Sequence, residues 1–471
     1  MAAVQPEQLN FLLVPLMAPG HVIPMIDMAK MLARHGVNVT IMLTPLNFNR
    51  FSSVVNRAAM SGLPIRLLQI RFPSEEAGLP AGCESADTLP SYQLLHNFFT
   101  AIKLLQAIVE EKMEEIDPVP SCVICDKHLP WMAESCEKFE IPRISFDGMS
   151  CFTQLVMHNL YVSNIHKTVP DTVPFLVPGL PDEIEFTKLQ LPGLFNPRSN
   201  QLGDFREQVR ITESQAYGVV VNSFEELEKE YVDEFKKIRG GKVWSIGPLS
   251  LSNDGNLDRA ERGNQASIDA AQCSEWLDSR PPASVIYACL GSLARLSAAQ
   301  FVELALGLEA SNHPFILVVN SGSETEEIDE WISDQGFEER TRDQCLLIRG
   351  WAPQVLILSH PAVGGFMTHC GWNSTLEAIC AGVPMVTFPL FAEQFLNEKL
   401  VVQVLKIGVG LGLGSRIAVN LWEKDTPENK VTRDRIQAAV EMTMDQGERR
   451  ESHKSFGKWR KDPLKMEDPL S

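Results

Sequence analysis

Residues 10–43 read NFLLVPLMAPGHVIPMIDMAKMLARHGVNVTIML, and this stretch decides the fold class of the chain. Its first part, residues 10–17, is an almost unbroken apolar run, which is typical of a parallel strand buried on both faces. A Pro-Gly turn follows, and residues 22–36 then repeat apolar side chains at helical spacing. Residues 37–43 form a second apolar run. The order of strand, helix and strand predicts a βαβ unit and therefore an open α/β fold with a parallel sheet.

Two polar residues stand where predicted strands end. The first strand is expected to end immediately before His21, and the apolar run SCVICD at 121–126 ends on Asp126. In open α/β sheets, ligands bind in the loops outside the carboxyl ends of the strands. We therefore expect His21 and Asp126 to lie at a site.

The length of 471 residues is more than one hydrophobic core usually serves, so two large domains are expected. Within residues 240–282 the composition shifts to Gly, Asn, Asp and Ser, which is typical of a surface linker. Beyond it, apolar runs and helical segments alternate again and predict a second doubly wound α/β domain. We place the first domain at 1–245, the second at 246–445 and a tail at 446–471.

Composition excludes several kinds of partner. A formal net charge of −18 repels nucleic acid and anionic lipid surfaces. No apolar run reaches the ~18 residues of a membrane span, and the first residues lack the basic start of a secretory signal. Among ten scattered cysteines, only Cys122 and Cys125 have a suggestive spacing, and their apolar surroundings predict buried thiols rather than a zinc or redox pair. These features predict a cytoplasmic protein.

Several common site patterns are absent from the sequence. It contains no G-x-x-x-x-G-K-[ST] phosphate loop, no H-E-x-x-H zinc motif and no D-x-D that could hold a divalent cation on a diphosphate. The glycine-rich stretch GVGLGLG at 408–414 does not fit G-x-G-x-x-G, because Leu413 stands where the third glycine belongs. Nicotinamide chemistry therefore loses its main support, and no metal site is predicted.

Residues 351–394, WAPQVLILSHPAVGGFMTHCGWNSTLEAICAGVPMVTFPLFAEQ, are the most informative stretch. Residues 371–374, Gly-Trp-Asn-Ser, lead into a helix whose N-terminal N–H groups and small polar side chains suit an anion. Trp351 offers a flat face on which a base could stack, while Glu393 and Gln394 offer acceptors and donors for sugar hydroxyls. Phosphate, base and sugar together indicate a nucleotide sugar.

Each of these residues also has a purely structural interpretation. Ser374 and Glu377 fit a capping box, in which Glu377 only satisfies the helix N-terminus. His369, Trp351 and Trp372 could simply pack in the core. Taken singly, none of these residues decides between the two interpretations.

The combination of motifs is more specific than any single residue. The elements W-A-P-Q, H-C-G-W-N-S-x-x-E, G-V-P and E-Q, in this order, resemble the plant secondary product glycosyltransferase signature of the family 1 UDP-glycosyltransferases. The similarity extends over essentially the whole chain, through GHVIPMIDMAKML at 20–32, VVNSFEELE at 220–228 and SVIYACLGS at 284–292. RGWAPQVLILSH and PLFAEQFLNEKLVV look like the subgroup that acts on flavonoids, other phenolics, triterpenoids or steroids. The resemblance implies the GT-B fold, in which two Rossmann-like domains place their parallel sheets on either side of a central cleft.

The resemblance also implies a role for each matching residue. In the family the acceptor binds mainly on the first domain and the UDP-sugar mainly on the second. The residues implied to bind the donor are Trp351, Ala352, Gln354 and Glu377 for the uridine, Ser292, His369, Asn373 and Ser374 for the diphosphate, and Trp372, Glu393 and Gln394 for the hexose. His21 matches the family's catalytic histidine and Asp126 its partner aspartate. We expect the acceptor to meet the region 146–153, including Phe146 and Met149.

These residues predict one reaction. A phenol has a pKa near 10 and histidine near 6.5, so His21 would take the acceptor proton as the new bond forms, while Asp126 orients and stabilises the imidazolium. Attack on the face opposite the leaving diphosphate inverts the anomeric carbon. We expect a monomer that needs no metal or other cofactor and uses UDP-glucose as co-substrate. The side-chain amide of Gln394, which can both donate to and accept from equatorial hydroxyls, favours glucose.

The acceptor is expected to be a phenolic, flavonoid-like small molecule, and some alternatives stay open. A triterpenoid or steroid acceptor, or a glucuronosyl or galactosyl donor, fits the same subgroup. A catalytically weak UDP-sugar-binding protein on the same fold is the alternative class, and the presence of His21 with Asp126 argues against it. Family members end in a C-terminal helix that crosses back to the first domain, whereas residues 446–471 here are short, charged and interrupted by proline.

Overall fold

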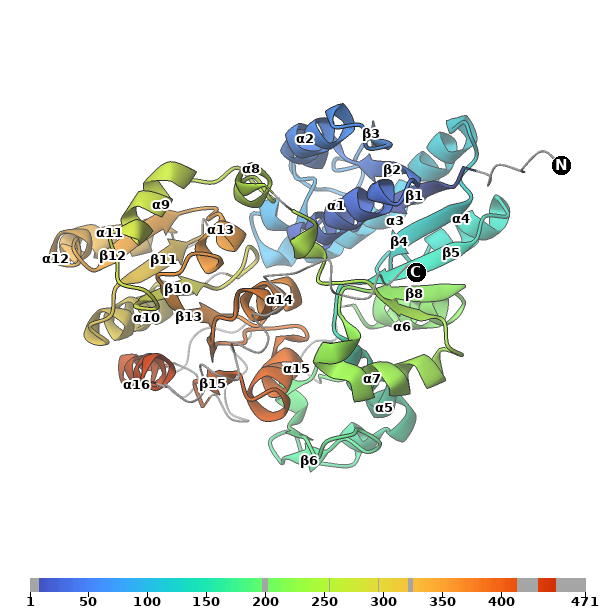
Figure 1. Ribbon diagram of the computed structural model, residues 1–471. Coiled ribbons are helices and arrows are strands. Elements are labelled where there is room, and N and C mark those ends of the chain that lie inside the picture. Colours follow the sequence, from blue (N-terminus) through green and yellow to red (C-terminus); the bar gives the residue numbers. More distant parts are fainter. Residues whose placement is uncertain are drawn as a thin grey trace.

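The computed structural model describes residues 8–196, 202–253, 255–294, 296–320, 325–412 and 431–445. Figure 1 shows two α/β halves side by side, with the first half coloured blue to green and the second yellow to red. Each half is built on its own sheet, and every strand pair in these two sheets is parallel. The βαβ prediction and the two-sheet α/β prediction are both confirmed.

The first sheet has seven strands in the described residues, in the order β3-β2-β1-β4-β5-β8-β9. Its strands are β1 Asn10–Val14, β2 Asn38–Leu43, β3 Ile65–Gln69, β4 Cys122–Asp126, β5 Arg143–Asp147, β8 Gly218–Val221 and β9 Val243–Ser245. The helices around it are α1 Pro19–Arg34, α2 Pro45–Met60, α3 Leu95–Glu115, α4 Met132–Lys138, α5 Cys151–Ser163, α6 Gly203–Ser214 and α7 Glu225–Ile238. A small antiparallel pair, β6 Phe175–Leu176 with β7 Glu185–Phe186, lies outside the sheet.

The second sheet has six strands in the described residues, in the order β12-β11-β10-β13-β14-β15. Its strands are β10 Val285–Cys289, β11 Phe315–Val319, β12 Cys345–Arg349, β13 Val363–Thr368, β14 Met385–Thr387 and β15 Gly408–Gly410. The helices of this half are α8 Asn256–Ala260, α9 Ala270–Asp278, α10 Ala298–Ala310, α11 Thr325–Asp334, α12 Phe337–Arg340, α13 Gln354–Leu358, α14 Trp372–Ala381, α15 Gln394–Lys399 and α16 Arg433–Met444. The short turns are η1 Ala86–Thr88, η2 Tyr92–Leu94, η3 Ile165–Lys167, η4 Lys188–Gln190, η5 Leu249–Ser252 and the π-helical η6 Leu400–Val404.

Both sheets are covered on both faces, which explains their continuous apolar strands. In β1, Leu12 and Val14 pack into one core and Leu13 into the other. Cys122 and Cys125 of β4 are buried in the same two cores. All ten cysteines, each within the described residues, are free thiols, so the prediction of buried thiols at this pair is confirmed.

Helix α1 begins earlier than the sequence suggests. β1 ends at Val14 and α1 already begins at Pro19, so His21 lies in the first turn of a helix and not in a loop. Proline is favoured in the first helical turn because its missing N–H would have no partner there. His21 is therefore held by a regular element, at the carboxyl edge of the sheet.

The segment between the sheets is less exposed than a surface linker. It runs from the end of β9 at Ser245 to the start of β10 at Val285. Ser250 and Asn253 are buried, and Asn253 donates to Asp27 of α1 over 2.8 Å. The tail at 446–471, and with it the question of whether it packs back, lies outside the described residues. In the parts of the chain that the structure describes, no helix combines the length and apolar character needed to cross a bilayer.

Close packing of α10 on α16 generates a stability prediction. A Cβ at Gly307 would lie 2.7 Å from the Cβ of Ile436 and 2.8 Å from the carbonyl oxygen of Arg433. We expect Gly307→Ala to lower the thermal unfolding midpoint, because overpacking of about 1 to 3 kcal/mol outweighs the roughly 1 kcal/mol that alanine gains over glycine in a helix. Gly255→Ala is the control, since a Cβ there meets nothing within 4 Å. A midpoint raised by Gly307→Ala would contradict the packing described.

Candidate active site

His21 and Asp126 form a hydrogen-bonded pair at the carboxyl edge of the first sheet. The Nδ1–H of His21 donates to Oδ2 of Asp126 over 2.6 Å. Asp126 is almost fully buried, with 1% of its side chain exposed, whereas 26% of the His21 side chain is exposed. Because Nδ1 is engaged with the carboxylate, Nε2 is the nitrogen left to take a proton from a substrate.

Burial and charge oppose each other at this pair. Burial by itself lowers the pKa of His21, but the negative charge and hydrogen bond of Asp126 outweigh it, so that the pKa lies above the ordinary 6.5. Burial would raise the pKa of Asp126, yet the charge of His21 and the hydrogen bonds from the two neighbouring histidines hold that pKa well below its usual range. Asp126 therefore stays ionised and stabilises a protonated His21.

A second histidine, His128, shares the same carboxylate. Its ring Nδ1 and its backbone N–H each lie 2.9 Å from Oδ1 of Asp126. The rings of His21 and His128 meet edge to face, with their centroids 5.3 Å apart. Burial lowers the pKa of His128, so this ring stays neutral. Sequence reasoning missed His128, although its position two residues after Asp126 was a usable signal.

The same three side chains could also be considered as metal ligands. One ligand atom from each of His21, Asp126 and His128 lies within 4.8 Å of the others. In the structure, however, both Nδ1 atoms are already accounted for by hydrogen bonds to the two oxygens of Asp126. The arrangement therefore fits a base held by a buried carboxylate.

A cavity of about 270 Å³ lies between the two halves. It is lined by residues that follow β1 and β4 on one side and by the loops after β10, β12 and β13 on the other. The sequence-predicted residues that line it are His21, Met149, Ser292, Trp351, Ala352, Gln354, His369, Trp372, Asn373, Ser374, Glu377, Glu393 and Gln394. The structure thus brings together residues that are up to about 370 positions apart in the chain.

The N-terminus of α14 opens into this cavity. The helix begins at Trp372, and Gly371 is its N-cap residue, with no capping side chain among the described residues. Ser374 therefore lies inside the first turn and not at the N-cap, so the capping-box interpretation of Ser374 with Glu377 is wrong. Uncapped N–H groups and the helix dipole make this end suitable for a phosphate group.

His369 lies against the same helix end. A Cβ added at Gly291 or Gly371 would come within 2.4 Å of its ring, so the ring is tightly enclosed by backbone. Its Nδ1 is buried and has no hydrogen-bond partner within the described structure. Burial lowers the pKa of His369 to about 4, which keeps the ring neutral near pH 7.

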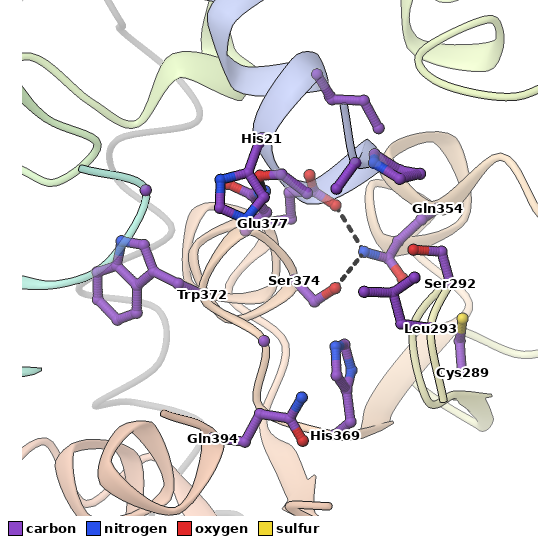
Figure 2. Close-up of a pocket in the computed structure, with 18 of the residues that line it drawn as sticks. His21, Cys289, Ser292, Leu293, Gln354, His369, Trp372, Ser374, Glu377 and Gln394 are labelled. Carbon is purple, nitrogen blue, oxygen red and sulfur yellow. Dashed lines mark hydrogen bonds between the residues drawn. The ribbon is translucent and has the colours of Figure 1, made fainter. Parts of the chain in front are cut away.

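Glu377 and Ser374 are joined by Gln354. The amide nitrogen of Gln354 donates to Oγ of Ser374 over 2.9 Å and to Oε2 of Glu377 over 2.7 Å. Figure 2 shows Gln354 between these two residues, with both hydrogen bonds drawn as dashed lines. The carboxylate of Glu377 is thus held by the first residue of α13.

Two residues of α14 cross the cleft to the first half. The indole N–H of Trp372 donates to the carbonyl oxygen of Asn222 over 2.7 Å, and the Asn373 amide donates to the carbonyl oxygen of Gly20 over 2.7 Å. Asn222 in turn donates to Asn373 over 3.1 Å. Asn222, which follows β8, is a further residue that sequence reasoning missed. Because Gly20 directly precedes His21 in the chain, the bond from Asn373 brings the start of α14 close to His21.

Two expectations for individual residues need correction. Phe146 was expected to meet the acceptor, but it is fully buried in the core of the first half and lines neither cavity described here. Side chains alternate along β5, and Phe146 points to the α1 side of the sheet while its neighbour Asp147 lines the cleft cavity. The Gln394 oxygen, expected to accept from the sugar, already accepts from the N–H groups of Leu390 and Phe391. Only its amide nitrogen is left for a ligand.

A second, larger cavity of about 960 Å³ adjoins the first. Its walls are mainly apolar side chains of α3, α5 and α6, among them Phe99, Met157 and Phe205. His21 and Glu393 line both cavities. His21 therefore lies where the cleft cavity and the larger apolar cavity meet.

Known proteins are similar to this chain over most of its length. Residues 265–411 match the family model described as UDP-glucoronosyl and UDP-glucosyl transferase. UDP-glycosyltransferase 73E1 of Stevia rebaudiana is 49% identical over 448 residues, covering 94% of this chain and 89% of that protein. UDP-glycosyltransferase 73C2 of Arabidopsis thaliana is also 49% identical, covering 93% and 88%. The chain belongs to the plant family 1 UDP-glycosyltransferases.

Solved structures place this glycosyltransferase in the GT-B fold. Glycyrrhiza uralensis UGT73P12, complexed with glycyrrhetinic acid 3-O-monoglucuronide, superposes with a TM-score of 0.89 at 35% identity, covering 98% of this chain and 93% of that one. Medicago truncatula UGT71G1, complexed with UDP-glucose, superposes with a TM-score of 0.75 at 23% identity, covering 98% and 96%. The prediction of a GT-B glycosyltransferase is confirmed.

The His21 and Asp126 pair predicts how the transferase responds to pH. Since the pKa of His21 is raised above 6.5, the base is protonated at low pH, and kcat/KM should fall as the pH drops through a midpoint above 6.5. Asp126→Asn removes the charge that raises this pKa, so the midpoint should move to lower pH while the maximal rate also falls. The measurement is a pH profile of both proteins with one hydroxylated acceptor.

His21→Ala serves as the reference variant in the same assay. We expect it to lower the rate by ~10² to 10⁴ and to have a larger effect than Asp126→Asn, because it removes the base itself. UDP binding should persist, since Trp351 and Glu377 are untouched. Near-normal turnover of His21→Ala would contradict the assignment of His21 as the base.

Proposed function

We propose that this enzyme transfers glucose from UDP-glucose to a hydroxyl group of an apolar, phenolic small molecule of the flavonoid type, with inversion at the anomeric carbon. The observation that carries the proposal is the position of His21, whose free nitrogen lies where the cleft cavity adjoins the apolar cavity. A hydroxyl in the apolar cavity and a sugar in the cleft can both reach this junction.

The donor is proposed to lie along the second half of the cleft. Trp351 would stack on the uracil, and Glu377 would accept hydrogen bonds from the ribose hydroxyls. The diphosphate would lie at the N-terminus of α14, near His369 and Ser374. Uncapped helix amides attract the charge that grows on the departing UDP, so they favour the transition state over the ground state.

The proton and the glycosyl group move in one concerted step. The acceptor hydroxyl gives its proton to Nε2 of His21 as its oxygen attacks C1 of the glucose from the face opposite the diphosphate. The C1–oxygen bond to UDP breaks, and UDP departs as the anion. Asp126 remains ionised and stabilises the imidazolium that results. An α-linked donor therefore yields a β-glucoside.

Glu393 is the main candidate for recognising the hydroxyl groups of the hexose. Burial raises its pKa, yet it lines both cavities beside His21, and its two oxygens can accept from neighbouring hydroxyls. Gln394 contributes its amide nitrogen only, since its oxygen is held by backbone N–H groups. The preference for glucose thus depends on Glu393 more than the sequence suggests.

A triterpenoid or steroid is the second candidate acceptor. The apolar cavity of about 960 Å³ is at the upper end of the usual range for small-molecule sites, which is about 300 to 1,000 Å³. The structure of UGT73P12, at 35% identity, holds glycyrrhetinic acid 3-O-monoglucuronide, which is larger than a flavonoid. Both observations support a cavity that admits a polycyclic acceptor of either size.

The setting of the enzyme is part of the proposal. All ten described cysteines are free thiols, as expected in a reducing compartment, and we place the enzyme in the cytoplasm as a monomer. A binding protein without activity would have no use for a buried carboxylate that orients a histidine toward the acceptor cavity. We therefore favour an active transferase.

Competition between donors tests the proposed sugar. With UDP-glucose, UDP-galactose and UDP-glucuronic acid at equal concentrations and one acceptor, we expect mostly glucoside by mass spectrometry after chromatographic separation. An axial C4 hydroxyl would leave a polar group of the site unpaired, which costs about 1 to 3 kcal/mol, or ~5- to 150-fold in product ratio. A predominance of galactoside or glucuronide would overturn the assignment to glucose. The same screen with a flavonoid and a triterpenoid alcohol decides between the two acceptor classes.

Chelation tests the proposal that no metal takes part. We expect EDTA to leave the rate unchanged, because the helix N-terminus takes the role that a cation has in D-x-D transferases. The treatment also tests the cluster of His21, Asp126 and His128 as a metal site. Loss of activity on chelation, with recovery on adding Mg²⁺, Mn²⁺ or Zn²⁺, would refute the proposal.

A further inference from the structure

A buried arginine of the segment between the sheets connects both halves of the molecule at the donor cavity. Arg262 donates from Nε to Oδ2 of Asp27 in α1 over 2.7 Å, and from a terminal nitrogen to Oε1 of Glu377 in α14. Only 8% of the Arg262 side chain is exposed, with 3% for Asp27 and 4% for Glu377. Arg262 also lines the cleft cavity. One guanidinium thus links the first half to the carboxylate proposed to hold the ribose.

The residues that follow Arg262 in the chain contact both the backbone and the ring of Trp351. Ser267 donates its backbone N–H to the carbonyl oxygen of Trp351 over 2.8 Å, and its hydroxyl accepts from the Trp351 backbone N–H over 2.9 Å. Gly263 has φ of +108°, and a Cβ there would lie 2.3 Å from the indole ring. The segment 262–267 therefore contacts two of the residues assigned to the uridine, Glu377 and Trp351.

Both oxygens of Glu377 have a protein donor. Arg262 holds Oε1 and Gln354 holds Oε2, and each carboxylate oxygen keeps a second acceptor direction. These bonds leave room for ribose hydroxyls, and they fix the plane of the carboxylate before the nucleotide arrives. A charge-assisted bond from a planar guanidinium is well suited to this, because its donors lie in a rigid fork.

We propose that Arg262 is a positioning residue of the donor site, which holds the Glu377 carboxylate in the orientation that recognises a ribose and anchors it to Asp27 of the other half. The inference rests on the proposed function, in that Glu377 is taken as the ribose-binding residue. The inference goes beyond the proposed function by making the segment between the sheets part of the nucleotide site. Without Arg262, the carboxylate is free to turn toward other donors and discriminates less between a ribose and a deoxyribose.

The competing explanation is that Arg262 only attaches the segment between the sheets to the first half. The chain offers a matched control for this explanation. Arg57 of α2 also attaches the segment between the sheets to the first half. It forms ion pairs with Asp258 over 3.0 Å and Glu261 over 2.5 Å. Arg57 does not line the cleft cavity. If both arginines only attach the segment between the sheets to the first half, replacing either one should have the same effect on nucleotide binding.

The experiment measures the dissociation constants of UDP and 2′-deoxy-UDP by titration calorimetry. The proteins are the full chain, Arg262→Met, Arg262→Lys and Arg57→Met, each checked by its thermal unfolding midpoint. We expect the unsubstituted chain to prefer UDP by about tenfold or more, and Arg262→Met to lose most of this preference by binding UDP more weakly. Arg262→Lys, which keeps the charge but not the fork, should be intermediate. Arg57→Met should keep the full preference.

The outcomes separate this inference from the proposed function. If the unsubstituted chain prefers UDP and both Arg262 variants keep that preference, Arg262 does not position Glu377 and the inference is overturned. The same holds if Arg57→Met loses as much preference as Arg262→Met. If the unsubstituted chain binds the two nucleotides equally, the assignment of Glu377 to the ribose fails, and the inference fails with it. Should Arg262→Met not fold, Arg262→Lys alone decides.

Discussion

The hydrogen bond between His21 and Asp126 depends on the parallel pairing of β1 with β4. Because Val14 lies opposite Cys125 in this register, the chain leaves both strands at the same edge, and α1 begins close enough to return His21 to the end of β4. The pairing of β10 with β13 likewise carries Ser292 and His369 to one edge of the second sheet. Two parallel sheets whose carboxyl ends share one cleft therefore place His21, the proposed base, opposite the N-terminus of α14, the proposed diphosphate site.

The charges of the site follow the direction of the reaction. A net charge of −18 opposes the binding of a diphosphate at long range, so the cleft must supply positive potential locally. The N-terminus of α14, together with Arg259 in the cavity wall, is proposed to supply it on the donor side. On the acceptor side, the buried charge of Asp126 favours a protonated His21, the state that His21 would reach in the proposed reaction as the acceptor attacks. In the proposed reaction, negative charge thus moves to the helix end with the departing UDP, while positive charge forms on His21 beside Asp126.

Sequence patterns predicted the helices, the strands and the residues that follow strands. They failed for residues whose role depends on contacts with distant segments of the chain. His21 and Asp126 could be found because each lies near the end of an apolar strand. Phe146 was assigned to the wrong side, because strand alternation needs the true register before it says which face a residue shares. The contacts of Arg262 with Asp27 and Glu377 join three segments separated by more than 100 residues, and no local pattern specifies such a junction. Composition alone described that segment as a surface linker.

The stereochemistry of transfer is the sharpest test of direct displacement with His21 as the base, because a base and a leaving group on opposite faces of the sugar permit only one outcome. The measurement is the proton NMR spectrum of the first product formed from α-linked UDP-glucose, before any further transfer. We expect a β-glucoside, recognised by the large diaxial coupling of its anomeric proton. An α-glucoside, with the small coupling of an equatorial anomeric proton, would show that His21 does not act in a direct displacement across this cleft.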